Sequence, residues 1–501
     1  MPEIDDKISR RRRGNTKDLE EKTKFKSFGG TLKVLDQNEC KQIHKAVLYI
    51  LSEIGLSEIS QNTSEVASSA GALIKNGRLY FPKSMTEDAI ASLARPLILH
   101  GQEAKNDLPI SGKEVYFGTG GATPKIVDFK TGEFRDSQLN DLYDNARLVE
   151  HLENVDFFSR TVIARDIKTQ KSLDINTVFA CLRGTSKHIM TSVSNANDVK
   201  EIKKVLDYIR SEKQKKNNKN LISLNTNHVV SPLRFDPDSC DVLIEGVKSG
   251  LPINVNTFAQ VGASSAVTLA GAIAQTLAET MAGMILGWLV DKQAILIFGP
   301  RPMITDLRTG AIAGGSAEQP LATAMAGQMA QYYGLANSTI SGATDSKLPD
   351  AQSGFEKASN IQMAALSGVN LITQACGSQA SLMATSFIAS VIDNDMLGII
   401  RRSGAKIEVN ETTLALDSIK DVVNGDGHFL GQPETYERMR SDYLYPIVSD
   451  RRSHQDWKDA GSPKLIDTAK TRVEEILSIT GPTHLKLETI NEINKKFELT
   501  N

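Results

Sequence analysis

The sequence predicts an α/β protein built as one (β/α)8 TIM barrel, and three observations lead to this prediction. Eight short apolar segments rich in β-branched residues begin near residues 115, 157, 188, 221, 252, 294, 337 and 370. Their starts lie 31 to 43 residues apart, which leaves room for one helix in each interval. Helical patterns fill those intervals, and alternating strands and helices predict a parallel sheet. An open doubly wound sheet also alternates, but it requires no particular number of units.

The predicted elements divide the chain into three parts. Residues 1–110 are expected to form an N-terminal helical extension, with a helix from Asp36 to Ile54 that ends at Gly55. Residues 111–400 carry the barrel, with helices near 137–152, 172–184, 196–212, 238–249, 266–290, 315–333, 350–366 and 380–400. Residues 401–501 are expected to form an α-rich C-terminal extension that packs beside the barrel.

Composition narrows the class of protein. The 501 residues carry a formal net charge of −2 and are 40% hydrophobic, which is typical of a soluble globular protein and argues against nucleic acid as the main partner. The four cysteines are far apart and show no CxxC spacing, so we expect a reduced, cytoplasmic protein without a zinc site. Residues 266–290 are long and apolar but include Gln275 and Glu279, so a buried helix is expected there and no membrane partner. The basic run Arg10–Gly14 is either a solvated arm or a clamp on a neighbouring subunit, and with the terminal helices it suggests a homo-oligomer.

In a barrel of this kind the active site is built from residues at the carboxyl ends of the strands. Amides, carboxylates and phenylalanines gather at these positions, and Arg301 also follows the sixth strand. Such a rim suits a small polar or cationic ligand held by amides and aromatic faces. The candidate catalytic residues are Asp345, Lys347, Glu318 and His228; the candidate binding residues are Phe298, Phe258, Tyr116, Asn225, Asn227, Asn256 and Gln374.

Each of these residues also has a structural interpretation. His228 is a base, a metal ligand or a core residue, and no second His or Cys stands at ligand spacing, so we expect no directly bound metal. The Asp345–Lys347 cluster is either functional or a helix cap with a local ion pair. Glu318 either faces a cation or caps a helix. Phe258 and Phe298 form an aromatic cage or belong to the core.

Five blocks of sequence resemble the corrinoid-dependent trimethylamine methyltransferase family, which includes glycine betaine methyltransferases. The blocks around 128–157 and 342–357 are the most specific. The resemblance rests on Arg10–Gly14, on Asp128–Arg135 with the helix that follows through Asp156-Phe157, on Gly314-Gly-Ser, on Thr344–Gln352 and on Gly427–Gly431.

The resemblance implies a barrel enzyme that passes a methyl group from an amine to the cobalt of a corrinoid carried by a separate protein. Trimethylamine-specific members contain pyrrolysine, and this sequence has only standard residues, so the resemblance favours a quaternary ammonium substrate similar to glycine betaine. On this interpretation Phe258, Phe298 and Tyr116 hold the cation, and the amides orient a carboxylate. Glu318 and Asp345 then tune the local field.

Alternative functions remain open at this point. A tertiary amine of the trimethylamine type is the alternative substrate. A metal-assisted lyase or hydrolase would need a cluster of carboxylates and histidines around His228. A noncatalytic barrel would bind betaines, or dock the corrinoid protein, without transferring a methyl group.

Overall fold

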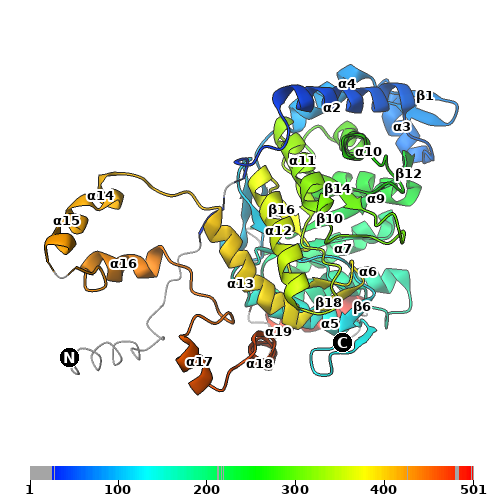
Figure 1. Cartoon of the computed structure of the whole chain (residues 1–501). Coiled ribbons are helices and arrows are strands. Elements are labelled where there is room, and N and C mark those ends of the chain that lie inside the picture. The colour runs from blue at the N-terminus through cyan, green and yellow to red at the C-terminus, as the bar shows by residue number, and fades with distance from the viewer. Residues whose placement is uncertain are drawn as a thin grey trace.

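A computed structural model describes residues 25–27, 29–211, 214–215, 217, 219–425, 427–479, 484–497 and 499 (Figure 1). The basic run Arg10–Gly14 lies outside these residues. The chain forms a body of helices around a parallel sheet, and part of the C-terminal region extends away from that body.

All eight predicted strands are present, and they are divided between two parallel sheets. Five of them form a parallel sheet in the order β14-β13-β10-β9-β8, and three form a parallel sheet in the order β15-β16-β5. Single parallel bridges, Gly118–Phe157 and Phe298–Asn337, stand between the edges of the two sheets. The fold is therefore mixed α/β with a curled parallel sheet. The strands are β5 (Tyr116–Phe117), β8 (Phe157–Ser159), β9 (His188–Thr191), β10 (Ile222–Asn227), β13 (Ile253–Val261), β14 (Leu296–Ile304), β15 (Ser338–Ile340) and β16 (Leu371–Thr373).

The predicted helices follow these strands, and several begin at a polar cap. Asn195, Asp236 and Asp350 each accept a backbone N–H bond at the start of α7, α9 and α12. Helix α10 is long and apolar enough to cross a membrane, but 78% of its most apolar window is buried, as expected for a core helix. The helices are α5 (Leu139–Glu150), α6 (Gln170–Gly184), α7 (Ala196–Ile209), α9 (Pro237–Lys248), α10 (Leu269–Val290), α11 (Glu318–Tyr332), α12 (Ala351–Ser367) and α13 (Phe387–Ser403).

Strand alternation separates an inner face of the curled sheet from an outer one. The outer face carries the main core, in which Phe298 packs edge-on against Tyr333, the C-cap residue of α11. At the amino ends of the strands, a separate inner cluster includes Phe157, Met190 and Ile297. It also contains Leu99 and Leu108 of the hairpin β3 (Leu97–Leu99) and β4 (Leu108–Ile110), so this hairpin covers the inner core at that end.

The rest of the N-terminal region packs on the helical layer. Helices α2, α3 and α4 contact α10. Asp36 and Glu39 form a capping box at the start of α2, as the sequence predicted for a helix beginning there. These elements are α2 (Gln37–Tyr49), the π-helical turn η2 (Ile50–Ile54), α3 (Gln61–Ser69), β1 (Leu73–Lys75), β2 (Arg78–Tyr80), α4 (Lys83–Leu93) and the 3-10 turn η3 (Ala104–Asn106).

Small sheets that the sequence did not predict lie in the loops that follow the strands. β6 (Lys125–Val127), β7 (Phe134–Asp136), β17 (Ser378–Gln379) and β18 (Ala384–Ser386) form one sheet, in the order β17-β18-β6-β7. β11 (Val229–Val230) pairs with β12 (Arg234–Phe235).

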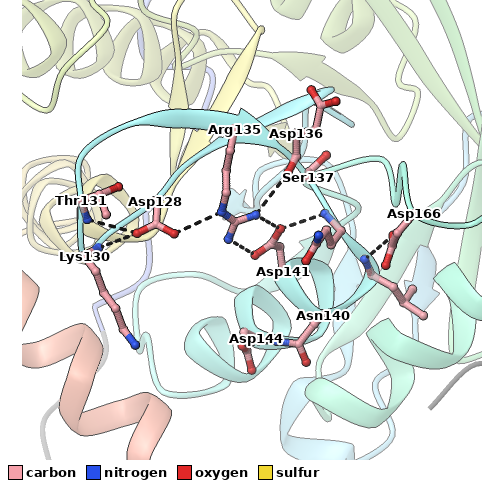
Figure 2. A network of polar contacts seen from close by, with 12 residues as sticks. Asp128, Lys130, Thr131, Arg135, Asp136, Ser137, Asn140, Asp141, Asp144 and Asp166 are labelled. Carbon is pink, nitrogen blue, oxygen red and sulfur yellow. Dashed lines mark hydrogen bonds and ion pairs between the residues drawn. The ribbon is translucent and has the colours of Figure 1, made fainter.

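Arg135 fixes the β6–β7 hairpin to the start of α5. It donates two 2.7 Å bonds to Asp141 and one of 3.1 Å to Asp128, as Figure 2 shows. The sequence block Asp128–Arg135 is thus explained as a structural hairpin.

The C-terminal region divides into a packed part and a projecting part. α18 (Leu465–Ser478) packs on α13 and α5, and α19 (Leu487–Phe497) packs on α7. α14 (Glu411–Leu414), α15 (Leu416–Asn424) and α16 (Pro433–Ser441) stand away from the body in Figure 1, and α17 (His454–Asp459) follows them.

Candidate active site

Amide side chains line the inner face near the carboxyl ends of the central strands. Asn225 of β10 pairs in register with Asn254 of β13, and Asn256 pairs with Gly299 of β14. Asn254 Nδ2 donates to Asn225 Oδ1 at 2.9 Å, and Asn256 Nδ2 donates to the same oxygen at 3.3 Å. One amide oxygen thus organises three asparagines, because a shared acceptor fixes the orientation of both donors.

Hydroxyl groups extend this amide cluster to both sides of the inner face. Asn225 Nδ2 donates to Ser159 Oγ of β8 at 3.3 Å, and Ser338 Oγ of β15 donates to Asn254 Oδ1 at 2.6 Å. Gly299 is required here, because a Cβ at this position would lie 2.3 Å from Asn256 Oδ1. The cluster joins strands that are far apart in the sequence across one interior.

Arg301 shares this interior. Its register partner on β13 is Phe258, and two-residue alternation from Gly299 places its side chain on the inner face. Nε of Arg301 is buried without a hydrogen-bond partner among the described residues. Burial alone lowers the pKa of Arg301 to about 10, with no nearby charge contributing. The Arg301 residue as a whole is half-buried, and its guanidinium is a cation that no carboxylate in the described chain compensates.

Two amide oxygens and one aromatic ring complete the lining. Asn256 Oδ1 and Gln374 Oε1 are buried and have no partner among the described residues. Gln374 follows β16 with φ of 61°, in the left-handed region that non-glycine residues rarely adopt. Phe258 is half-buried and packs beside Met303 and Ile340 at the open end. The interior thus offers a cation, two open acceptors and an apolar face.

A second cluster shapes the rim above β14 and β15. Glu356 of α12 accepts the Asp345 backbone N–H at 2.9 Å and the Thr344 hydroxyl at 2.5 Å. Asp345 in turn accepts the Gly315 N–H at 3.1 Å and the Ser381 hydroxyl at 2.7 Å. A Cβ on Gly315 would lie 2.2 Å from the Glu356 carboxyl, so this loop can approach only with glycine there. The Gly314–Ser316 and Thr344–Gln352 sequence blocks meet at this point.

Four of the sequence-predicted binding residues lie in this interior: Asn225, Asn256, Gln374 and Phe258. Asn227 ends β10 and is exposed at the same rim. Asp345 is half-buried in the rim cluster, where it binds loop atoms.

The other predicted residues lie elsewhere. His228 is fully buried against Gly283 of α10, where Nε2 donates to the Glu279 carbonyl at 2.9 Å and burial lowers its pKa to about 4. Phe298 lies in the outer core. Tyr116 lies near the amino ends of the strands and donates to the Pro109 carbonyl at 2.7 Å.

The two remaining predicted residues are exposed. Glu318 stands in the first turn of α11, and Lys347 donates to the Asp345 carbonyl. The structure shows no side-chain cap at the start of α11, and the bond of Lys347 goes to a backbone carbonyl; the cap of α12 is Asp350.

Arg301 is the residue to which sequence reasoning gave no role. Its signal was present in the strand itself, where Ile297, Gly299 and Arg301 occupy alternate positions and place one cation on an otherwise apolar or small face. Ser159 and Ser338 carried no sequence signal. Among the described residues, no group of three His, Cys, Asp or Glu side chains gathers where a metal would bind.

The fold and the lining together define a class of protein: an α/β enzyme fold with a polar site at the carboxyl ends of a curled parallel sheet. The chain belongs to the trimethylamine methyltransferase (MTTB) family, whose sequence model matches residues 6–497. It is a methyltransferase, as are its named relatives.

Three relatives illustrate the range of the similarity. The trimethylamine methyltransferase MttB of Desulfitobacterium hafniense (strain DSM 10664 / DCB-2) is 31% identical over 443 residues, covering 88% of each chain. That of Methanosarcina barkeri is 30% identical, covering 90% of this chain and 92% of its own. A glycine betaine methyltransferase of D. hafniense (strain Y51) is 25% identical, covering 85% and 88%.

One solved structure supports the fold. The monomethylamine methyltransferase (MtmB) of Methanosarcina barkeri aligns with a TM-score of 0.52, covering 90% of both chains at 12% identity. At this identity the likeness concerns the fold alone.

Proposed function

We propose that this methyltransferase moves a methyl group from a zwitterionic quaternary ammonium compound of the glycine betaine class to the Co(I) of a corrinoid carried by a separate protein. We infer the substrate class from one observation: the Arg301 guanidinium inside the sheet has no counter-charge among the described residues. A buried charge without a partner is costly, and a substrate carboxylate placed beside it removes that cost.

The other end of such a substrate is matched by the open acceptors. Asn256 Oδ1 and Gln374 Oε1 present partial negative charge, and Phe258 presents an aromatic face. These are the groups that attract a methylated ammonium. A zwitterion therefore finds complementary charge at both ends of the interior. The aromatic assignment from the sequence is kept, whereas the amide oxygens, which the sequence analysis assigned to the carboxylate, are here assigned to the ammonium end.

The proposed chemistry does not require a general acid. When a methyl group leaves a quaternary nitrogen, the bonding pair stays on nitrogen and the product is a neutral amine. The protein therefore positions the methyl group and excludes water. The amide cluster around Asn225 orients the substrate. Asp345 and Glu356 hold the rim loop in place, and we assign them positioning roles.

We further propose that the two sheets form one closed eight-stranded barrel. The single bridges at both sheet edges support closure, as do the backbone bonds Phe298 N–Ala336 O and Asp156 N–Phe117 O at 2.9 and 2.6 Å. The barrel mouth would then receive the corrinoid of the partner protein. We divide the chain at residues 110 and 400, and we expect a cytoplasmic enzyme because the four cysteines are unpaired and buried.

Trimethylamine is the competing substrate, favoured by the names of the more similar relatives. It has no anionic group to place beside Arg301, and its protonated form would be repelled there. The two proposals therefore differ in how they depend on this one side chain.

The test measures methyl transfer to cob(I)alamin by its visible spectrum, with and without a cognate corrinoid protein. The substrates are glycine betaine, tetramethylammonium and trimethylamine. We expect turnover of the betaine and a loss of about 100-fold or more in its kcat/KM in Arg301→Gln, because a buried charge-assisted contact is worth about 3 kcal/mol. Arg308→Gln is the matched control, since Arg308 is an exposed arginine on the next turn and should retain full activity.

Different results separate the alternatives. Turnover of trimethylamine alone, unaffected by Arg301→Gln, would reject the zwitterion proposal. Betaine binding in calorimetry without any methyl transfer would identify a noncatalytic binding protein.

A further inference from the structure

Residues 406–445 form an arm that leaves the body of the protein. Helices α14, α15 and α16 lie in this arm, and Figure 1 shows them standing apart from the helices of the body. The base of the arm is fixed to α13: Arg402 Nε donates to the Asp442 carbonyl at 3.0 Å, and Asp395 accepts the backbone N–H groups of residues 447–449 at 2.8 Å. The arm is thus held in an outward direction and does not fold onto its own body.

The arm is unusually apolar for an exposed segment. Of the 31 large hydrophobic side chains that are exposed in the described chain, twelve lie within these 40 residues. Leu416, Ile419 and Val423 share one face of α15 and are 68%, 43% and 73% exposed. At the tip, Leu430 is 86% exposed. The tip is the Gly427–Gly431 block, which the active site does not use.

This surface is large enough for a stable interface. With roughly 150–200 Å² for a whole large side chain, the twelve residues present on the order of 1,000 Å² of apolar area. A standard interface buries about 800 Å² on each partner. Helices as short as α15 and α16 are also marginal in water unless a neighbour covers them. The arm therefore needs a covering surface.

The body of the same chain presents a matching apolar surface, which we call the socket. It lies between the start of α12, the middle of α13 and the start of α18, around a groove of about 670 Å³. Leu348 and Phe355, which are the sequence neighbours of the groove residues Pro349 and Gly354, are 55% and 64% exposed. We define the socket as the apolar groove residues Ile392, Met396, Leu465 and Ile466 together with Leu348 and Phe355. Charged side chains also line the groove, namely Asp350, Asp393, Lys464 and Asp467.

We propose that the arm of one copy of this chain covers the socket of a second copy, in a reciprocal exchange. The chain carries both surfaces, and its own arm points outward, so a twofold pairing satisfies each arm and each socket at once. The arm contains eight acidic and four basic residues, which disfavours an anionic lipid surface or a nucleic acid as the covering partner. This inference does not depend on the proposed substrate.

The first test measures the mass of the full chain by light scattering. We expect a dimer or a larger even assembly for the wild type and a monomer for the double variant Leu416→Asp, Val423→Asp. The matched control is Leu73→Asp, Leu307→Asp, because these side chains are 58% and 64% exposed outside the arm. The control should retain the wild-type mass, and circular dichroism should show all three proteins folded.

The second test identifies the contacting surfaces. The four native cysteines are buried, so Leu430→Cys and Phe355→Cys chains each carry one accessible thiol. Mixing the two variants under oxidation should give a disulfide-linked dimer that contains one chain of each. A monomeric wild type, an arm variant that keeps its full mass, or no cross-link above the level of the Leu73→Cys control would each overturn the proposal. If the wild-type chain is a monomer, a different protein must cover the arm.

Discussion

Replacing Arg301 with methionine should make the free protein more stable while removing its response to the substrate. Burial lowers the folded-state pKa of Arg301 to about 10, below the usual value for an arginine, so folding disfavours the charged form. Each pKa unit corresponds to about 1.4 kcal/mol, which gives an upper limit of about 3 kcal/mol. Because the side chain is partly exposed, water screens the charge, and we expect a gain of about 1–2 kcal/mol at pH 7.

Thermal unfolding with and without glycine betaine measures both effects. Arg301→Met should melt about 1–3 °C above the wild type without ligand, because a chain of this length shifts by only a degree or two per kcal/mol. Ligand at about 100 times its Kd should stabilise the wild type by about 2.7 kcal/mol and leave the variant unchanged. A variant that melts lower than the wild type, or that gains equally from the ligand, would refute the assignment of Arg301 as the anion-binding group.

Three further predictions concern other parts of the structure. Gly299→Ala places a Cβ 2.3 Å from Asn256 Oδ1, so kcat/KM should fall at least about tenfold in the cobalamin assay, and normal kinetics would exclude Asn256 from the site. Arg401→Met removes the Arg401–Asp156 ion pair, in which the two side chains approach to 2.6 Å and are each 5% exposed, so urea unfolding should show a loss of about 3–5 kcal/mol. Burial lowers the pKa of His228 to about 4 from the usual 6.5, so its contribution to the free energy of unfolding, up to about 3 kcal/mol, is present above pH 6.5 and is lost as the pH falls toward 4. His228→Gln should flatten this dependence of stability on pH and leave kcat unchanged. A loss of kcat in this variant would instead identify His228 as a catalytic base.

The order of elements was predictable because local patterns report it directly. Eight apolar segments spaced for intervening helices gave strands β5, β8, β9, β10, β13, β14, β15 and β16, and helix α10 was correctly expected to be buried. Asp36 signalled the start of α2 through its capping box. The small sheet that contains β6 and β18 was not predictable, since its strands are two or three residues long and are paired only by tertiary contacts.

The sequence predicted which positions lie near the candidate site, but it did not predict which of their side chains point into the same interior. Residues at strand ends were expected near the rim, and the structure brings Asn225, Asn256, Gln374 and Phe258 to one interior. The face that a strand residue occupies depends on register, and a shift of one position exchanges the inner and outer faces. For that reason Phe298, next to Gly299 in β14, belongs to the outer core, while Arg301 points inward.

By itself, the sequence determined the alternation of strands and helices, the position of the rim residues and the resemblance to a methyltransferase family, because each is encoded in spacing or in short blocks of residues. Only the tertiary structure decided which of those residues share one interior. It did so through burial: the same packing that hides His228 against α10 leaves the Arg301 guanidinium desolvated and without a counter-charge. The pKa of a charged side chain depends on the groups around it, and in this protein those groups belong to strands that are distant in the sequence.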